Sequence, residues 1–234
     1  MIIDILDHTL RNIFKAEQLT GSKVLGVFTR PLSLTARRYN KIYTTLSAKT
    51  LCNSAITYFN PDQYNIVNLI SNEPGEGKSY VMKQMAQQFT EQNFEVIQLS
   101  WQDEFQTNAQ AFIQSLNLEQ FALQGNNKLK DKVIIVEYPS LKDAALTSNI
   151  LQNVSLNLQI IDSRRTWKNK DQQLFKRTKE MCNHMPIFLI LNYTNRDAAE
   201  DINGLMPPYT FLRKLFYRIS QLGLTANDKP LHHA

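Results

Sequence analysis

Short apolar segments alternate with longer amphipathic segments over most of the chain, and this alternation restricts the possible folds more than any other feature. The apolar segments predict strands at 24–28, 66–71, 95–99, 132–137, 158–162 and 186–192. The segments around them have helical periodicity and predict helices at 2–14, 34–59, 78–91, 108–116, 141–152, 167–181 and 209–222. Strands that are apolar on both faces are typical of parallel sheets covered by helices, so the pattern predicts an α/β fold with a mainly parallel sheet flanked by helices.

The alternation becomes regular only from Asn65, after a stretch dominated by helical periodicity. We therefore expect an N-terminal helical extension at 1–60, packed on an α/β domain at 61–234. The 43% of apolar residues excludes a disordered chain. The longest apolar run, 187–191, is far shorter than the roughly 18 residues of a membrane-spanning helix, and the N-terminus has no signal-peptide pattern.

The segment 70–79, with the sequence ISNEPGEGKS, connects a predicted strand to a predicted helix. Gly75 and Gly77 allow backbone N–H groups to point inward around a phosphate, without a Cβ in the way. The Lys78 side chain can reach the β- and γ-phosphates, and the Ser79 hydroxyl can bind Mg²⁺. A helix-capping turn with a solvated lysine is the alternative, and it is disfavoured because only seven glycines occur in the chain. We interpret the segment as the phosphate-binding loop of a P-loop NTPase-like domain that binds ATP or ADP with Mg²⁺.

Phosphoryl transfer also requires a carboxylate near the phosphates, to hold the metal and to accept a proton from the nucleophile. Glu137 ends the strand predicted at 132–137, and acids at the ends of neighbouring strands lie close to such a loop. A solvated acid at the end of a strand is the alternative for Glu137. Asp103, after the strand at 95–99, is the next candidate, although an ordinary loop acid is the better interpretation for it.

Several segments resemble the cytoplasmic domain of bacterial tyrosine kinases (BY-kinases) of the polysaccharide co-polymerase type. The most specific is Glu73–Ser79, which resembles the Walker A loop of that family. The segment 16–28 resembles the region after its second membrane helix, and 133–139 resembles its Walker B strand. The segment 158–167 resembles the following strand and Arg-x-x-x-Thr turn, and 189–192 resembles a late strand that ends in Asn.

The resemblance implies which residues contact the nucleotide and the metal. It implies Lys78 and Glu137 as catalytic residues, Ser79 and Glu137 as Mg²⁺ ligands, Asn192 as a contact to the base, and a phosphate cradle made of Pro74, Gly75, Glu76, Gly77, Lys78, Ser79 and Tyr80. It further implies self-association and contact with polysaccharide export and polymerisation machinery. The expected location is the cytoplasmic face of the bacterial inner membrane, in a longer protein whose upstream region enters the membrane.

Four features depart from the family pattern. Asn72 stands where the loop usually has Gly or Ala, and Ser100 and Gln102 stand where the Walker A′ motif has two aspartates. The tyrosine cluster at the C-terminus is missing, since Tyr217 is the last tyrosine, and the family's Glu-x-x-Arg-x-x-Arg motif is not found. We therefore expect a pseudokinase-like domain that regulates assembly of an exopolysaccharide or capsule export complex. The alternative is an active tyrosine autokinase or ATPase that uses Glu137.

A basic run between Arg164 and Lys179 includes two aromatic residues, Trp167 and Phe175, and the net charge is +5. Nucleic-acid-binding surfaces combine cations and aromatic residues in this way. The aromatic residues fall at helical spacing, however, which favours aromatic core positions and a solvated cationic face, so we expect no nucleic-acid partner. The sequence shows no grouping of Cys and His residues that would predict a structural metal site. Its two cysteines are far apart in sequence and fit a reducing compartment.

Overall fold

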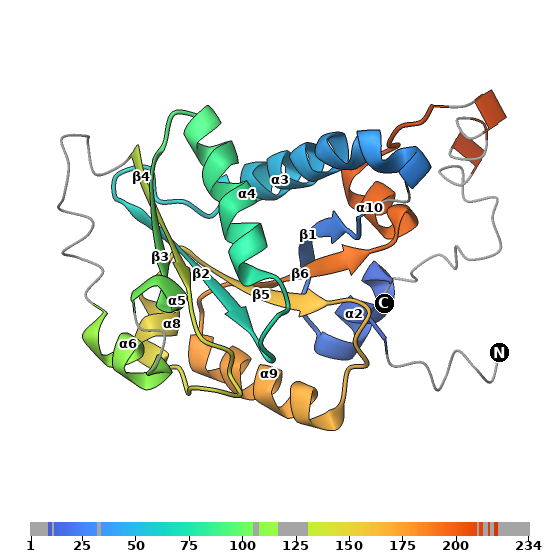
Figure 1. The fold of residues 1–234 in the computed structure, drawn as a ribbon. Coiled ribbons are helices and arrows are strands. Elements are labelled where there is room, and N and C mark those ends of the chain that lie inside the picture. Colours follow the sequence, from blue (N-terminus) through green and yellow to red (C-terminus); the bar gives the residue numbers. More distant parts are fainter. Residues whose placement is uncertain are drawn as a thin grey trace, which may run out of the picture.

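A computed structural model describes residues 9–10, 12–31, 34–104, 108–116, 131–209, 211–212, 215 and 218–219. Six strands form one sheet in the order β1-β6-β5-β2-β4-β3, and every pairing between them is parallel (Figure 1). The strands are β1 (Val24–Thr29), β2 (Asn65–Ser71), β3 (Glu95–Ser100), β4 (Lys132–Glu137), β5 (Leu156–Asp162) and β6 (Ile187–Thr194). The prediction of a parallel α/β sheet is confirmed.

Helices cover both faces of the sheet. They are α2 (Ile13–Thr20), the 3₁₀ helix η1 (Leu34–Tyr39), α3 (Asn40–Ile56), α4 (Lys78–Glu91), α5 (Trp101–Glu104), α6 (Ala109–Ser115), α8 (Ser148–Gln152), α9 (Asn169–Cys182) and α10 (Arg196–Asn203). Figure 1 shows α3 and α4 on one face and α2, α6, α8 and α9 on the other. α10 packs against β1 and α3 at the edge of the sheet.

Each strand contributes alternate residues to two separate apolar cores, which explains its continuous apolar sequence. In β2, Val67 and Leu69 pack with α3 and α4, whereas Ile66 and Ile70 pack with the helices of the opposite face. Successive side chains of a strand point to opposite faces, so a strand covered on both sides must be apolar at nearly every position.

The structure corrects the later part of the helix predicted at 2–14. Thr9 forms an antiparallel bridge with Thr166, and the helix α2 begins at Ile13. The side chain of Asn12 accepts a hydrogen bond from the Phe14 N–H (2.8 Å) and caps the helix. An asparagine that can accept from the first free N–H groups is a favoured helix start. Residues 2–8 lie outside the described part of the chain.

Two other helix predictions change in extent. The helix predicted at 141–152 spans only Ser148–Gln152, and the one predicted at 34–59 begins with a 3₁₀ helix. The helix α10 was not predicted, although Asn195 caps it by accepting a hydrogen bond from the Ala198 N–H (3.0 Å). Most of the helix predicted at 209–222 lies outside the described residues.

The order of the strands positions the candidate functional site. After β2 the chain adds β3 and β4 on one side, and then crosses to the other side to add β5 and β6. In a parallel sheet, the crevice at such a reversal lies at the carboxyl ends of the strands, and it is where ligands bind. The loop 72–77 leaves β2 at this point. Within the described residues, no helix has both the length and the apolar character needed to span a membrane.

Candidate phosphate-binding site

The loop between β2 and α4 leaves the first turn of α4 open to an anion. Gly75 has a φ of 77° and Gly77 a φ of 95°, values that L side chains rarely adopt. Gly77 is the N-cap residue of α4, and no side chain caps the helix there. The first N–H groups of a helix have no partner within it, and together with the helix dipole they attract a phosphate.

Asn192, at the carboxyl end of β6, packs directly against this loop. Its Nδ2 donates a hydrogen bond to the carbonyl of Glu76 (3.0 Å), and its Oδ1 accepts one from the Tyr193 N–H (2.9 Å). A Cβ at Gly77 would lie 2.0 Å from that Nδ2, so only glycine fits at this position. The side chain is 1% exposed and holds the loop in place, whereas its predicted contact to a nucleotide base stays a prediction.

Lys78 is buried at the start of α4, and its Nζ donates to the Ser71 hydroxyl (2.6 Å). Burial lowers the pKa of the ammonium group, and the negative charges of Glu137, Glu76 and Asp143 oppose that effect. Nearby carboxylates thus favour the charged form of a lysine that has lost much of its hydration.

Glu137 brings together two hydroxyl groups from different elements. The Ser79 hydroxyl donates to its Oε1 (2.7 Å), and the Ser100 hydroxyl donates to its Oε2 (3.2 Å). Ser100 and Glu137 are direct neighbours in the register of β3 and β4. Glu137 is 2% exposed, so the alternative of a solvated acid at a strand end is wrong.

This set of oxygen atoms suits a magnesium ion. Hydroxyl and carboxylate oxygens are the ligands that Mg²⁺ prefers, and Mg²⁺ is commonly held by one or two carboxylates together with substrate phosphates and water. In the described part of the chain, no three acidic, His or Cys side chains are grouped to hold a metal. Ser79 and Glu137 would therefore hold the ion together with the nucleotide, rather than as a closed protein site.

The remaining candidates are spread around the loop. Pro74 is exposed, while the Tyr80 ring packs edge-on against Phe28 and its hydroxyl lies 2.9 Å from the Thr44 Oγ1 of α3. Gln102 is exposed on α5, and the side chain of the neighbouring acid at 103 lies outside the described residues.

Sequence reasoning missed Asp143, whose charge acts on Lys78 and whose Oδ2 accepts a hydrogen bond from the Ser140 hydroxyl (2.5 Å). Asp143 is exposed and follows β4 by six residues, in a segment that was predicted to be helical. The only available signal was its position soon after Pro139, in the turn that follows a strand end.

The structure also explains the unusual residue at position 72. The amide of Asn72 is fully buried and turns toward β5 and α9: its Oδ1 accepts from Gln159 Nε2 (3.1 Å), and its Nδ2 donates to the Asp171 carbonyl (3.1 Å). The Asn72 side chain therefore points away from the loop, toward β5 and α9. The position accommodates a side chain, so it does not require glycine.

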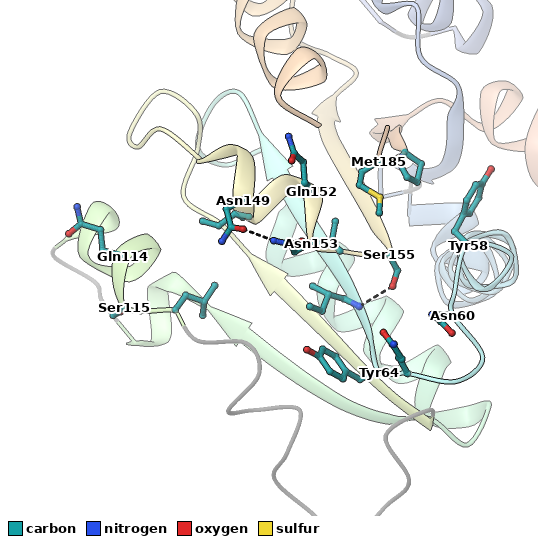
Figure 2. A pocket seen from close by; sticks show the side chains of 16 residues that line it. Tyr58, Asn60, Tyr64, Gln114, Ser115, Asn149, Gln152, Asn153, Ser155 and Met185 are labelled. Carbon is teal, nitrogen blue, oxygen red and sulfur yellow. Dashed lines mark hydrogen bonds between the residues drawn. The ribbon is translucent and has the colours of Figure 1, made fainter. Parts of the chain in front are cut away.

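A separate cavity of about 1030 Å³ lies at the opposite end of the strands, near the amino-terminal ends of β2 and β6 (Figure 2). Tyr58, Tyr64 and Met185 lie at its wall with several neutral amide side chains. None of the 16 residues that line it is charged. It is therefore poorly suited to a phosphate group and is separate from the loop at the carboxyl ends of the strands.

No protein-family model and no curated protein matches the chain. Solved structures do match in fold. The kinase domain of the Escherichia coli tyrosine kinase ETK is 11% identical with a TM-score of 0.56, and the match covers 86% of this chain and 100% of that one. The BceF tyrosine kinase domain is 11% identical with a TM-score of 0.55, covering 80% of this chain and 100% of that one.

The chimerical protein CapA2B2 is 13% identical with a TM-score of 0.53, and the match covers 79% of this chain and 100% of that one. At such identities the likeness concerns the fold. The protein thus has a parallel α/β fold like that of bacterial tyrosine kinase domains.

Proposed function

We propose that the protein binds ATP or ADP with Mg²⁺ as a pseudokinase-like regulatory domain, and that it transfers phosphoryl groups weakly or not at all. One observation carries the proposal. The Ser79 hydroxyl lies 2.7 Å from the carboxylate of Glu137, beside the buried Lys78 and the open first turn of α4. A cation, a metal-binding hydroxyl and a carboxylate are the parts that phosphate binding needs at one place.

Each of these residues has a separate task in the proposal. The N–H groups of the first turn of α4 and the Lys78 ammonium bind the phosphate oxygens, and Ser79 and Glu137 hold Mg²⁺. The metal neutralises phosphate charge when it is bound. A Cβ added at Gly75 would meet no atom within 4 Å beyond its chain neighbours, so the outer side of the loop has room for a ligand.

Weak transfer is expected because charge is missing where the related motif has it. The Ser100 hydroxyl donates a hydrogen bond to Glu137, and the Gln102 side chain is exposed. Neither side chain carries a negative charge. Phosphoryl transfer relies on positioning and charge neutralisation, so losing a carboxylate that binds metal or accepts a proton removes several orders of magnitude in rate.

The biological setting rests on the resemblance. Under the proposal the domain self-associates, and its nucleotide state regulates an exopolysaccharide or capsule export complex. It would act at the cytoplasmic face of the bacterial inner membrane, as part of a longer protein.

The test compares binding and turnover in the same preparations. We expect calorimetry to detect Mg-ADP and Mg-ATP binding to the wild type, and to detect none with Lys78→Ala. Lys83→Ala is the matched control, because Lys83 is an exposed lysine on the same helix. We expect the wild type to form ADP from Mg-ATP no faster than Lys78→Ala does. Equal binding by Lys78→Ala and the wild type would overturn the proposal.

An active autokinase or ATPase is the second candidate, and it is favoured by the contact between Glu137 and Ser79 together with the charge of Asp143 near Lys78. Turnover that disappears in both Lys78→Ala and Glu137→Gln would establish it. Under the pseudokinase proposal, Ser100→Asp combined with Gln102→Asp raises turnover in a variant that still binds ATP.

A further inference from the structure

The carboxylate of Glu76 holds the phosphate loop in shape from inside. Its Oε2 accepts hydrogen bonds from the N–H groups of Asn72 (3.0 Å) and Glu73 (3.2 Å), and the residue is only 2% exposed. The side chain of one loop residue thus fixes the backbone at the beginning of the same loop. A buried carboxylate of this kind requires a cation nearby, because burial of an unpaired charge is strongly unfavourable.

Arg165 supplies that cation from the turn after β5, 89 residues away in sequence. Its Nε lies 3.0 Å and its Nη2 2.9 Å from Glu76 Oε1, and its Nη1 lies 2.8 Å from Asp171 Oδ2. The two acidic side chains are 2% and 5% exposed, and that of Arg165 is 24% exposed. One guanidinium therefore pairs with two buried carboxylates, which its planar set of donors permits and a lysine could not reproduce.

Asp171 belongs to the first turn of α9 and organises the start of that helix. Its Oδ2 accepts a hydrogen bond from the N–H of Lys168, the N-cap residue of the helix (2.9 Å). Asn72 also donates to this residue, at the carbonyl (3.1 Å) and at Oδ1 (3.3 Å). Two residues of the phosphate loop, at positions 72 and 76, are thus tied to the same helical turn.

We infer that Arg165 is a positioning residue for the phosphate loop, holding it through Glu76 against the first turn of α9. The affinity for nucleotide phosphate then depends on a guanidinium outside the loop, and on the placement of α9. This inference rests on the proposed function and adds to it a route by which α9 affects binding. In the absence of Arg165, the Glu76 carboxylate either takes up a proton or turns toward water, and the N–H groups of Asn72 and Glu73 lose their shared acceptor.

The first experiment measures the dissociation constant for Mg-ADP in Arg165→Gln. We expect affinity to fall by about tenfold or more, as is common when a partner behind a ligand-binding group is removed. The matched control is Arg177→Gln, which removes an exposed arginine from α9 and should leave affinity unchanged. Equal affinities in the two variants would overturn the inference.

Two further measurements separate positioning from loss of stability. Adding Glu76→Gln to Arg165→Gln should recover most of the affinity, because an amide oxygen still accepts the two N–H groups and needs no cation. Arg165→Lys keeps the charge but cannot bind both carboxylates, and it should weaken binding while preserving the fold. A loss that Glu76→Gln does not relieve would contradict the proposed route through Glu76.

Amide hydrogen exchange without nucleotide tests the inference even if the proposed function fails. In Arg165→Gln, exchange at residues 72 and 73 should become faster, while exchange in the β4 strand stays as slow as in the wild type. Unchanged exchange in the loop, or faster exchange throughout the sheet, would overturn the inference. A wild type that binds no Mg-ADP but shows the loop effect in Arg165→Gln would remove the proposed function and leave the positioning role intact.

Discussion

Replacing Gly77 by alanine tests whether Asn192 really closes against the phosphate loop. The φ of 95° at Gly77 is strained for alanine, and the new Cβ would lie 2.0 Å from Nδ2 and 3.3 Å from Cγ of Asn192. Asn192 has little freedom to withdraw, because it is buried and both ends of its amide are hydrogen-bonded.

The destabilisation has two parts that a second variant can separate. A left-handed conformation costs an alanine about 1–2 kcal/mol. Displacing the Asn192 amide from the Glu76 carbonyl leaves a buried polar group without a partner, which costs about 1–3 kcal/mol more. Gly75→Ala has the first part alone, because its φ is 77° and a Cβ there would meet nothing within 4 Å beyond its chain neighbours. The loss of unfolded-state entropy on replacing glycine is common to both variants and cancels in the comparison.

Urea unfolding of both variants gives the required difference in the free energy of unfolding. We expect Gly77→Ala to be less stable than Gly75→Ala by about 1–3 kcal/mol, with an unchanged dependence on urea concentration. Adding Asn192→Ala to Gly77→Ala should cost less than Asn192→Ala costs in the wild type, since the clash is removed. Equal stabilities of the two glycine variants would refute the close contact between Asn192 and the loop.

Three further predictions concern stability and reactivity. Phe89→Ala, at a fully buried position in α4, should lower the free energy of unfolding by about 3–5 kcal/mol in urea titrations. Cys52 and Cys182 are fully buried, and burial raises the pKa of both thiols, that of Cys182 to about 11, so neither should react with a thiol reagent at pH 8 until the protein unfolds. Burial raises the pKa of Asp171, but hydrogen bonds, chiefly from Arg165, hold it below its usual value. Its charge therefore stabilises the fold above about pH 4, the unfolded pKa, and this contribution is lost as the pH falls through the lower folded value. The stability difference between Asp171→Asn and the wild type should shrink in acid denaturation series below that pH, and a constant difference would contradict the ion pair.

The parts of the fold that follow from local pattern could be predicted from the sequence. The bounds of β4 and α4 agree with the prediction, because a strand buried on both faces and a helix that begins after Gly77 have clear local signals. The prediction of a helix over 141–147 was wrong, because the apolar residues of this segment, such as Ala144 and Leu146, are buried without being helical. Apolar spacing alone does not distinguish a packed turn from a helix.

In the candidate site too, residues that are close together in sequence could be predicted, and contacts between distant residues could not. The loop glycines, Lys78 and Ser79 were recognisable because their chemistry lies within a few consecutive residues. The pairing of Glu76 with Arg165 was not recognisable, since the two residues are 89 positions apart and nothing local in either segment indicates the other.

The sequence by itself determined the alternation of elements, the position of the glycine-containing loop between β2 and α4, and the uncharged side chains at Ser100 and Gln102. The tertiary structure alone decided that β2 lies between β4 and β5, that Ser79 and Ser100 meet on Glu137, and that Asn192 closes on Gly77. The physical reason is that backbone preference and burial pattern act over a few residues, so neighbouring residues in the sequence are enough to determine them. Contacts between strand ends depend instead on the order in which strands join the sheet, which is set by the packing of the whole chain.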